Sequence, residues 1–225
     1  MTKGERTKER IRQGVRNLLA SRDFMDIGID DVVEETDVPV GSIYFHFKNK
    51  DRLMEEVAEN GIESFFDYFV DIEEEDLFGA IFLYCWRSTQ QYVDRRGDTQ
   101  LVQWYLGRQR DRLEAGWMPR RIDLVKRLAA IATAEIGQPE VAPEDITLIE
   151  TLMTGTEQML IFGADQTTDI RKTQDETPVA LAKRLSTSWY RAIVGPAYVL
   201  PCNADDTIKG IVKRTKMLQR PIDLG

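Results

Sequence analysis

A short segment between residues 36 and 50 combines residue types that suit contact with phosphate and with bases. Gly41, Ser42 and Tyr44 stand there among apolar residues, and His46, the single histidine of the chain, follows. Hydroxyl groups can bond phosphate oxygens, and a glycine, which costs a helix about 1 kcal/mol relative to alanine, permits close approach of another backbone. One histidine cannot form a multi-histidine metal site, and no phosphate loop, dinucleotide-binding glycine motif or nucleophile elbow is present. The segment therefore predicts a binding surface rather than a catalytic centre.

These side chains need a short helix to hold them, and the surrounding residues define one. Pro39 starts a helix over about 40–46, and Phe47-Lys48-Asn49 ends it. A second short helix is expected over 29–36, followed by Asp37, which tolerates the left-handed conformation of a tight turn. Two helices joined by so few residues predict a helix-turn-helix.

Longer helices are expected on both sides of this pair. The apolar residues of 7–19 recur at helical spacing, which predicts one buried face with basic residues around the rest; they are Ile11, Val15, Leu18 and Leu19. Asn49 can cap a further helix that runs towards Val70.

The charge of the chain is unevenly distributed. Residues 1–22 hold seven basic and two acidic residues, a net charge of +5, although the whole chain carries −8. For a nucleic-acid binder the distribution of charge matters more than its sum. The acidic remainder predicts weak non-specific DNA binding with strong salt dependence.

The sequence Thr36-Asp37-Val38-Pro39-Val40-Gly41-Ser42-Ile43-Tyr44-Phe45-His46-Phe47-Lys48-Asn49-Lys50 resembles the TetR family of regulators, whose pattern here is roughly A-G-V-S-x-G-T-L-Y-x-Y/H-F-x-S/N-K. The resemblance covers about the first 60 residues. It implies an all-α fold with a three-helix DNA-binding domain at residues 1–50 and a helical effector-binding and dimerisation domain at 51–225. Pro39 replaces the usual serine, Asp37 a glycine, and Gly28 stands where a capping threonine is common; we expect Pro39 and Val40 to alter sequence preference.

Nine residues are candidate DNA contacts, by chemistry and by the resemblance. Tyr44 occupies the place where family tyrosines contact phosphate, and Lys50 matches the lysine that reaches the DNA backbone. Val40 and Phe45 can contact thymine methyl groups, whereas Ile43 and Phe47 are expected in the core. Gly41, Ser42 and His46 can also be ordinary surface residues, and Tyr44 a core aromatic. The candidates are Lys3, Thr7, Val40, Gly41, Ser42, Tyr44, Phe45, His46 and Lys50.

The remaining chain predicts further helices at about 76–95, 99–115, 119–136, 144–164, 177–194 and 205–218, without a strand pattern. The resemblance implies an effector cavity in the helices that precede the dimer interface. Its candidate lining residues, each of which can equally be a core or surface residue, are Cys85, Trp86, Thr89, Gln90, Trp104, Tyr105, Arg108 and Met153. The many aromatic residues of 65–105 favour a planar or hydrophobic small molecule.

The resemblance also implies a homodimer through Glu144–Ala164 and Thr177–Val194. The apolar residues of these helices are Leu148, Leu152, Gly155, Met159 and Phe162 on the first, and Leu181, Leu185, Trp189 and Ile193 on the second. Trp189 would anchor the interface, although a helix pair buried within one subunit would show the same pattern.

The sequence thus favours a cytoplasmic, ligand-released repressor without a cofactor or metal, although activators share this architecture. No apolar run approaches the roughly 20 residues of a membrane span, and the N-terminus lacks the apolar core of a signal peptide. Two cysteines, Cys85 and Cys202, fit a reducing compartment. Two alternatives are open: a helical dimeric interaction protein that does not bind DNA, and a regulator that senses oxidants through Cys85 or Cys202.

Overall fold

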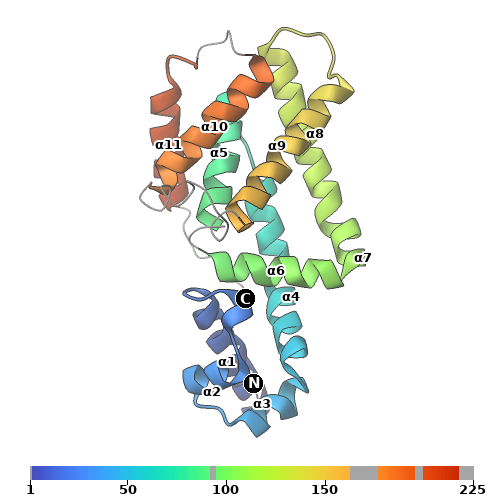
Figure 1. Ribbon diagram of the computed structural model, residues 1–225, viewed down its shortest axis with the longest axis vertical. Helices are drawn as coiled ribbons and strands as arrows, with labels where there is room; N and C mark the ends of the chain where they lie inside the picture. The colour runs from blue at the N-terminus through green and yellow to red at the C-terminus, as the bar shows by residue number, and fades with distance from the viewer. Residues whose placement is uncertain (1, 92–94, 163–176, 196–199, 218–225) are drawn as a thin grey trace. The chain divides into compact units, whose positions relative to one another are not determined.

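The computed structural model describes residues 2–91, 95–162, 177–195 and 200–217, and over these residues it consists of helices and their connections, without a strand (Figure 1). The all-α prediction is confirmed. None of the described helices is both long and apolar enough to cross a membrane.

The chain divides into two compact units. The first comprises Met1–Phe65 and Asp94–Leu113, and the second Phe66–Val93 and Glu114–Pro221. The expected division at residue 50 coincides with the start of a helix, but the first unit also includes most of that helix and a later one. Because these units reflect packing, the assignment of 1–50 as the DNA-binding domain stays a prediction.

The helices of the first unit are α1 (Lys3–Leu19), the 3-10 turn η1 (Phe24–Asp26), α2 (Ile29–Thr36), α3 (Val40–Phe47), the first part of α4 (Lys50–Val70), α6 (Arg96–Arg108) and α7 (Arg110–Arg112). Its core joins the apolar faces of the first helices, with Ile11, Val15, Val32 and Ile43 all fully buried. The apolar spacing of residues 7–19 predicted this burial for Ile11 and Val15, and Ile43 was expected in the core.

Local chemistry explains the limits of the first helices. Helix α1 begins four residues earlier than its apolar pattern indicates, because Thr2 and Glu5 form a capping box at its N-terminus. Asp37 adopts the expected left-handed conformation after α2, with φ 50° and ψ 33°. Asn49 accepts a hydrogen bond from the backbone of Arg52 at 2.8 Å, as predicted for the cap of α4.

The helices of the second unit are the end of α4, α5 (Leu77–Thr89), the π-helical turn η3 (Leu113–Trp117), α8 (Met118–Glu135), α9 (Pro143–Phe162), α10 (Pro178–Val194) and α11 (Ala204–Met217). Every residue of α5 is buried, and α8, α9, α10 and α11 all pack against it. Helix α5 is therefore the central element of this unit.

Two expected helices differ from the prediction. The helix expected over 76–95 is α5, which already ends at Thr89. The sequence predicts a single helix over 99–115, whereas α6 ends at Arg108 and is followed by α7 and η3. Gln109 interrupts the helix, because its φ of −113° and ψ of 66° are not helical. The apolar pattern alone did not indicate this break.

Candidate nucleic-acid interface

Helix α3 has one buried and one exposed face, and both carry large apolar side chains. Ile43 is 0% and Phe47 2% exposed, as predicted for core residues. On the other face Val40 and Tyr44 are each 44% exposed and Phe45 is 84% exposed. Among the described residues only Met25 and Ile122 are further exposed large hydrophobic residues. Such a concentration on an eight-residue helix indicates a contact surface.

Gly41 lies on this exposed face, and no contact within the subunit requires a glycine there. A Cβ atom added at Gly41 would meet no atom within 4 Å. Alanine would favour the helix by about 0.5–1 kcal/mol. The open space is what close approach of an external molecule requires. Ser42 lies half-buried beside it.

The remaining polar candidates lie at the junction of α3 with α1. The ring of His46 lies 5.3 Å from that of Phe45, and its Cε1 would be 3.8 Å from a Cβ atom added at Gly4. Lys3 is exposed, and the half-buried Thr7 donates its hydroxyl hydrogen to the carbonyl of Lys3 at 3.1 Å. These side chains thus lie beside the N-terminus of α1.

Lys50 has a partner within its own unit. Its Nζ lies 5.9 Å from the centroid of the Phe24 ring, a cation–π contact between the start of α4 and η1. The expected contact of Lys50 with the DNA backbone therefore competes with this one.

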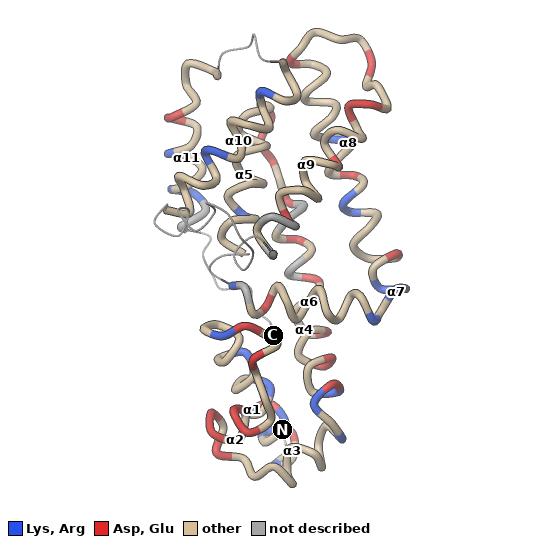
Figure 2. Tube along the Cα trace, viewed as in Figure 1, with Lys and Arg blue, Asp and Glu red and all other residues tan. Residues whose placement is uncertain are grey.

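The basic residues on or next to α1 and α3, among the Lys and Arg drawn in blue in Figure 2, fall into two groups by their contacts, which the sequence does not distinguish. Four are paired with carboxylates: Lys8 and Arg12 with Glu56, Arg12 and Arg16 with Glu9, and Arg22 with Asp31. Such pairing reduces their attraction for phosphate.

The second group keeps its charge available. Lys3, Arg6 and Lys48 are exposed and form no ion pair with the described residues. Arg10 donates to the backbone carbonyl of Asp37 at 3.0 Å, which leaves its positive charge unneutralised while it ties α1 to the turn before α3. Arg6, Arg10 and Lys48 were not among the expected DNA contacts, although the charge of the N-terminal segment pointed to this region.

Helix α6 packs directly on the end of α1 in the first unit. A Cβ atom at Gly97 would lie 2.3 Å from the carbonyl oxygen of Arg22 and 2.5 Å from that of Leu19. The side chain of Gln100 accepts a hydrogen bond from the backbone of Phe24 at 2.8 Å. A displacement of α6 would therefore be transmitted to α1 and η1.

Three of the eight expected effector contacts lie on α6, in this first unit. Trp104 packs its ring 5.3 Å from that of Phe24, and Arg108 pairs with Asp51 at 3.3 Å. Tyr105 donates its hydroxyl hydrogen to Glu59 at 3.1 Å, and burial together with this bond raises the pKa of Tyr105 to about 12. These three residues thus connect α6 to η1 and α4 within the first unit.

The other five expected effector contacts lie in the second unit. They are Cys85, Trp86, Thr89 and Gln90 at the end of α5 and Met153 on α9, and all are buried. The hydroxyl groups of Thr89 and its neighbour Ser88 have no hydrogen-bond partner among the residues that the structure describes. Buried hydroxyls are ordinarily satisfied, so these two are exceptions.

The second unit also contains a polar cluster around the buried Arg121, which the sequence did not predict. Arg121 of α8 is 5% exposed and donates to Glu150 at 2.9 Å, to Glu157 at 2.7 Å and to Thr154 at 2.9 Å. Tyr84 of α5 donates to the same Glu157. The cluster ties α5, α8 and α9 together, and the charge of Arg121 is paired with two carboxylates.

Trp189 has a different role from the one expected. It is 3% exposed, donates its indole hydrogen to Thr156 at 3.0 Å and packs 5.5 Å from the ring of Tyr84. Trp189 is thus part of the core of its own subunit and does not serve as an exposed interface anchor. The side chains of Met159 and Phe162, also expected at the interface, lie outside the described residues.

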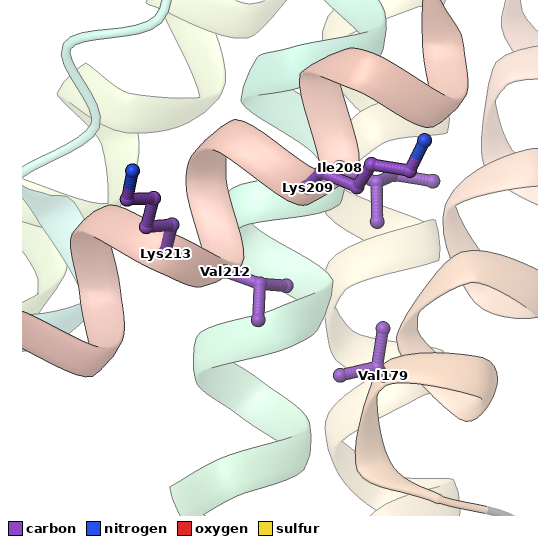
Figure 3. A pocket seen from close by; sticks show the side chains of 5 residues that line it. All are labelled: Val179, Ile208, Lys209, Val212 and Lys213. Atoms are coloured by element: carbon purple, nitrogen blue, oxygen red, sulfur yellow. The ribbon is translucent and has the colours of Figure 1, made fainter.

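A surface hollow of about 380 Å³ lies between α10 and α11 (Figure 3). It is lined by Val179, Ile208, Lys209, Val212 and Lys213. None of the eight expected effector contacts borders it.

Comparisons with known proteins bear on the first unit. The solved structure of RolR in complex with its ligand resorcinol is similar to this chain with a TM-score of 0.47 and 15% sequence identity, over 97% of this chain and 96% of that one. Among curated proteins no sequence match was found. Residues 11–57, which span most of α1, all of α2 and α3 and the start of α4, match the family described as bacterial regulatory proteins, tetR family. The helix-turn-helix part of this chain therefore belongs to the TetR family of bacterial transcriptional regulators.

Proposed function

We propose that this chain is a ligand-responsive transcriptional repressor that binds a palindromic operator as a homodimer and is released by a small molecule. The observation that carries the DNA-binding part is the exposed face of α3, where Val40, Tyr44 and Phe45 protrude around the bare backbone of Gly41. A short helix of this kind fits the major groove.

The cations that form no ion pair with the described residues also favour placing α3 in the major groove. Lys3 and Arg6 belong to the first turn of α1, and Lys48 follows the last residue of α3. Because the start of α1 lies beside His46, these three cations lie near the C-terminal end of α3, whereas Arg10, bonded to the carbonyl of Asp37, lies near its N-terminal end. Cations at both ends of a reading helix can contact phosphates on either side of the groove and so fix its register. The acidic charge of the remaining chain favours release from unrelated DNA.

The exposed residues of α9 support the dimer. A Cβ atom at Gly155 would meet no atom within 4 Å, and Leu148 and Leu152 are only half-buried in the single subunit. A second copy packed on this face would cover the two leucines, and Gly155 would allow close helix approach. The recognition helices of such a dimer would lie one DNA turn apart, roughly 34–36 Å.

The effector-dependent part rests on the unsatisfied hydroxyls of Ser88 and Thr89 and on the packing of α6 against α1. A small molecule with an apolar body and one or two polar atoms would suit the end of α5. Release requires that the effector bind one dimer shape more tightly than the other, typically by about 1–3 kcal/mol.

The redox alternative finds no support at Cys85. Burial raises the pKa of its thiol, so the thiol stays protonated and reacts slowly with oxidants. Cys202 is exposed, and a Cys202→Ser variant that still responds to an oxidant would exclude it as a sensor.

The proposal is tested by selecting bound sequences from random duplex DNA with the purified protein at moderate salt. A palindromic motif would support a dimeric, sequence-specific regulator and supply an operator for an effector-release screen. A folded, dimeric protein that enriches no sequence after removal of bound small molecules by unfolding and refolding would contradict the proposal. It would favour the interaction protein that does not bind DNA.

A further inference from the structure

Helix α3 lacks the side chains with which proteins form bidentate hydrogen bonds to base edges. Its eight residues, Val-Gly-Ser-Ile-Tyr-Phe-His-Phe, include no Arg, Lys, Asn, Gln, Asp or Glu. Arginine and lysine read guanine, asparagine and glutamine read adenine, and the carboxylates read cytosine in this way. A helix without them needs another feature of the base pair to obtain sequence specificity.

The exposed side chains of α3 are mainly apolar. Phe45 is 84% and Val40 44% exposed, and neither has a role in the core. Residues four apart are neighbours on a helix surface, so Phe45 stands next to the open backbone of Gly41, and Val40 stands next to Tyr44. The space above Gly41 contains no protein atom within 4 Å of a Cβ position. A flat duplex edge can therefore reach the side of the Phe45 ring.

The major groove presents one apolar group, the methyl group on C5 of thymine, and 5-methylcytosine presents the same group at the same ring position. Resting on the proposed function, we infer that α3 reads its operator chiefly through C5-methyl groups of pyrimidines, with Phe45 and Val40 as the specificity-determining residues. Thymine is the source of these methyl groups in ordinary DNA.

The loss of one contacted methyl group should change the binding constant by a predictable amount. Burying one methyl-sized group contributes about a fourfold change in binding constant. Each contacted thymine therefore contributes a modest factor, and the specificity of the operator is the product of several such factors in its two half-sites.

The experiment uses the operator obtained from the random-duplex selection. Thymine is replaced by uracil, which lacks only the methyl group, at one symmetric pair of positions at a time. Dissociation constants are then measured by fluorescence anisotropy at fixed salt. We expect a loss of about fourfold per contacted methyl group at the positions that α3 covers, or about fifteenfold for a symmetric pair. In a second arm a contacted T·A pair is changed to C·G with cytosine or with 5-methylcytosine, and the added methyl group should restore part of the affinity.

Variants link the effect to the two side chains. Phe45→Ala and Val40→Ala should each bind uracil and thymine duplexes alike at the positions that the deleted side chain contacts. Met25→Ala removes a comparably exposed apolar side chain (76%) from η1 and should keep every uracil penalty. Because all three side chains are exposed, the variants should fold, which circular dichroism checks.

The outcomes separate the inference from the proposed function. Tight, sequence-specific binding that is indifferent to uracil, or a uracil penalty that persists unchanged in both Phe45→Ala and Val40→Ala, would overturn the methyl readout and leave the regulator intact. Failure of the protein to enrich any duplex would overturn both.

Discussion

Replacing Gly41 by alanine should have opposite effects on stability and on DNA binding. The added Cβ meets no atom within 4 Å in the free protein, so the substitution introduces no clash. Alanine is the better helix former, and Gly41 is the second residue of α3. The free energy of unfolding should therefore rise by about 0.5–1 kcal/mol.

In the DNA complex the same methyl group would occupy the space that a base edge or sugar–phosphate backbone needs. Forcing an extra methyl group into a close-packed contact costs about 1–3 kcal/mol, which corresponds to a loss of roughly 5- to 150-fold in affinity. Gly41→Ala should thus be a more stable protein that binds its operator more weakly.

The two quantities are measured by chemical denaturation without DNA and by fluorescence anisotropy with the selected operator. Gly107→Ala is the matched control, because Gly107 is also exposed, lies next to the end of a helix and has no atom within 4 Å of its Cβ position. It should gain similar stability and bind DNA normally. If Gly41→Ala bound the operator as well as Gly107→Ala does, close approach of DNA to α3 would be refuted.

Three further substitutions test the other parts of the account. Gly97→Ala should lower the free energy of unfolding by about 1–3 kcal/mol in chemical denaturation, because its Cβ would lie 2.5 Å from the carbonyl oxygen of Leu19; an unchanged stability would show that α6 does not pack tightly on α1. Gly155→Leu should shift the protein from dimer to monomer in light scattering while its helicity is kept, and a persistent dimer would place the interface elsewhere. Arg6→Ala should reduce the slope of log binding constant against log salt by about 1, whereas Lys8→Ala, which removes a cation already paired with a carboxylate, should change it less; equal changes would contradict the division of the α1 cations into paired and available groups.

The helices of the first unit could be predicted closely from the sequence, because local signals agreed there. Apolar spacing located α1, Asp37 supplied the left-handed turn, and Asn49 supplied the cap of α4. The assignment of Ile43 and Phe47 to the core, and of Val40 and Phe45 to the exposed face of α3, could also be made from the sequence. The early start of α1 was missed because the Thr2–Glu5 capping box lies outside its apolar pattern.

The partners of individual side chains could not be predicted, because they depend on contacts between distant parts of the chain. Lys8 and Arg6 look alike in the sequence, and only the packing of α4 brings Glu56 to Lys8. Trp104 is an aromatic residue of an amphipathic helix whether it lines a cavity or, as here, packs on Phe24. Trp189 likewise could face a second subunit or its own core, and its hydrogen bond to Thr156 decides for the core.

The central claim is that the exposed face of α3 lies against DNA. It is tested most directly by replacing Phe45 with a benzoylphenylalanine photo-cross-linker and irradiating the protein with its selected operator. Cross-linking to the duplex from position 45, at bases inside the enriched motif, and little from the same cross-linker at the exposed Met25, is the predicted result. Cross-links that form equally well from position 25, or that fall outside the motif from position 45, would contradict the account.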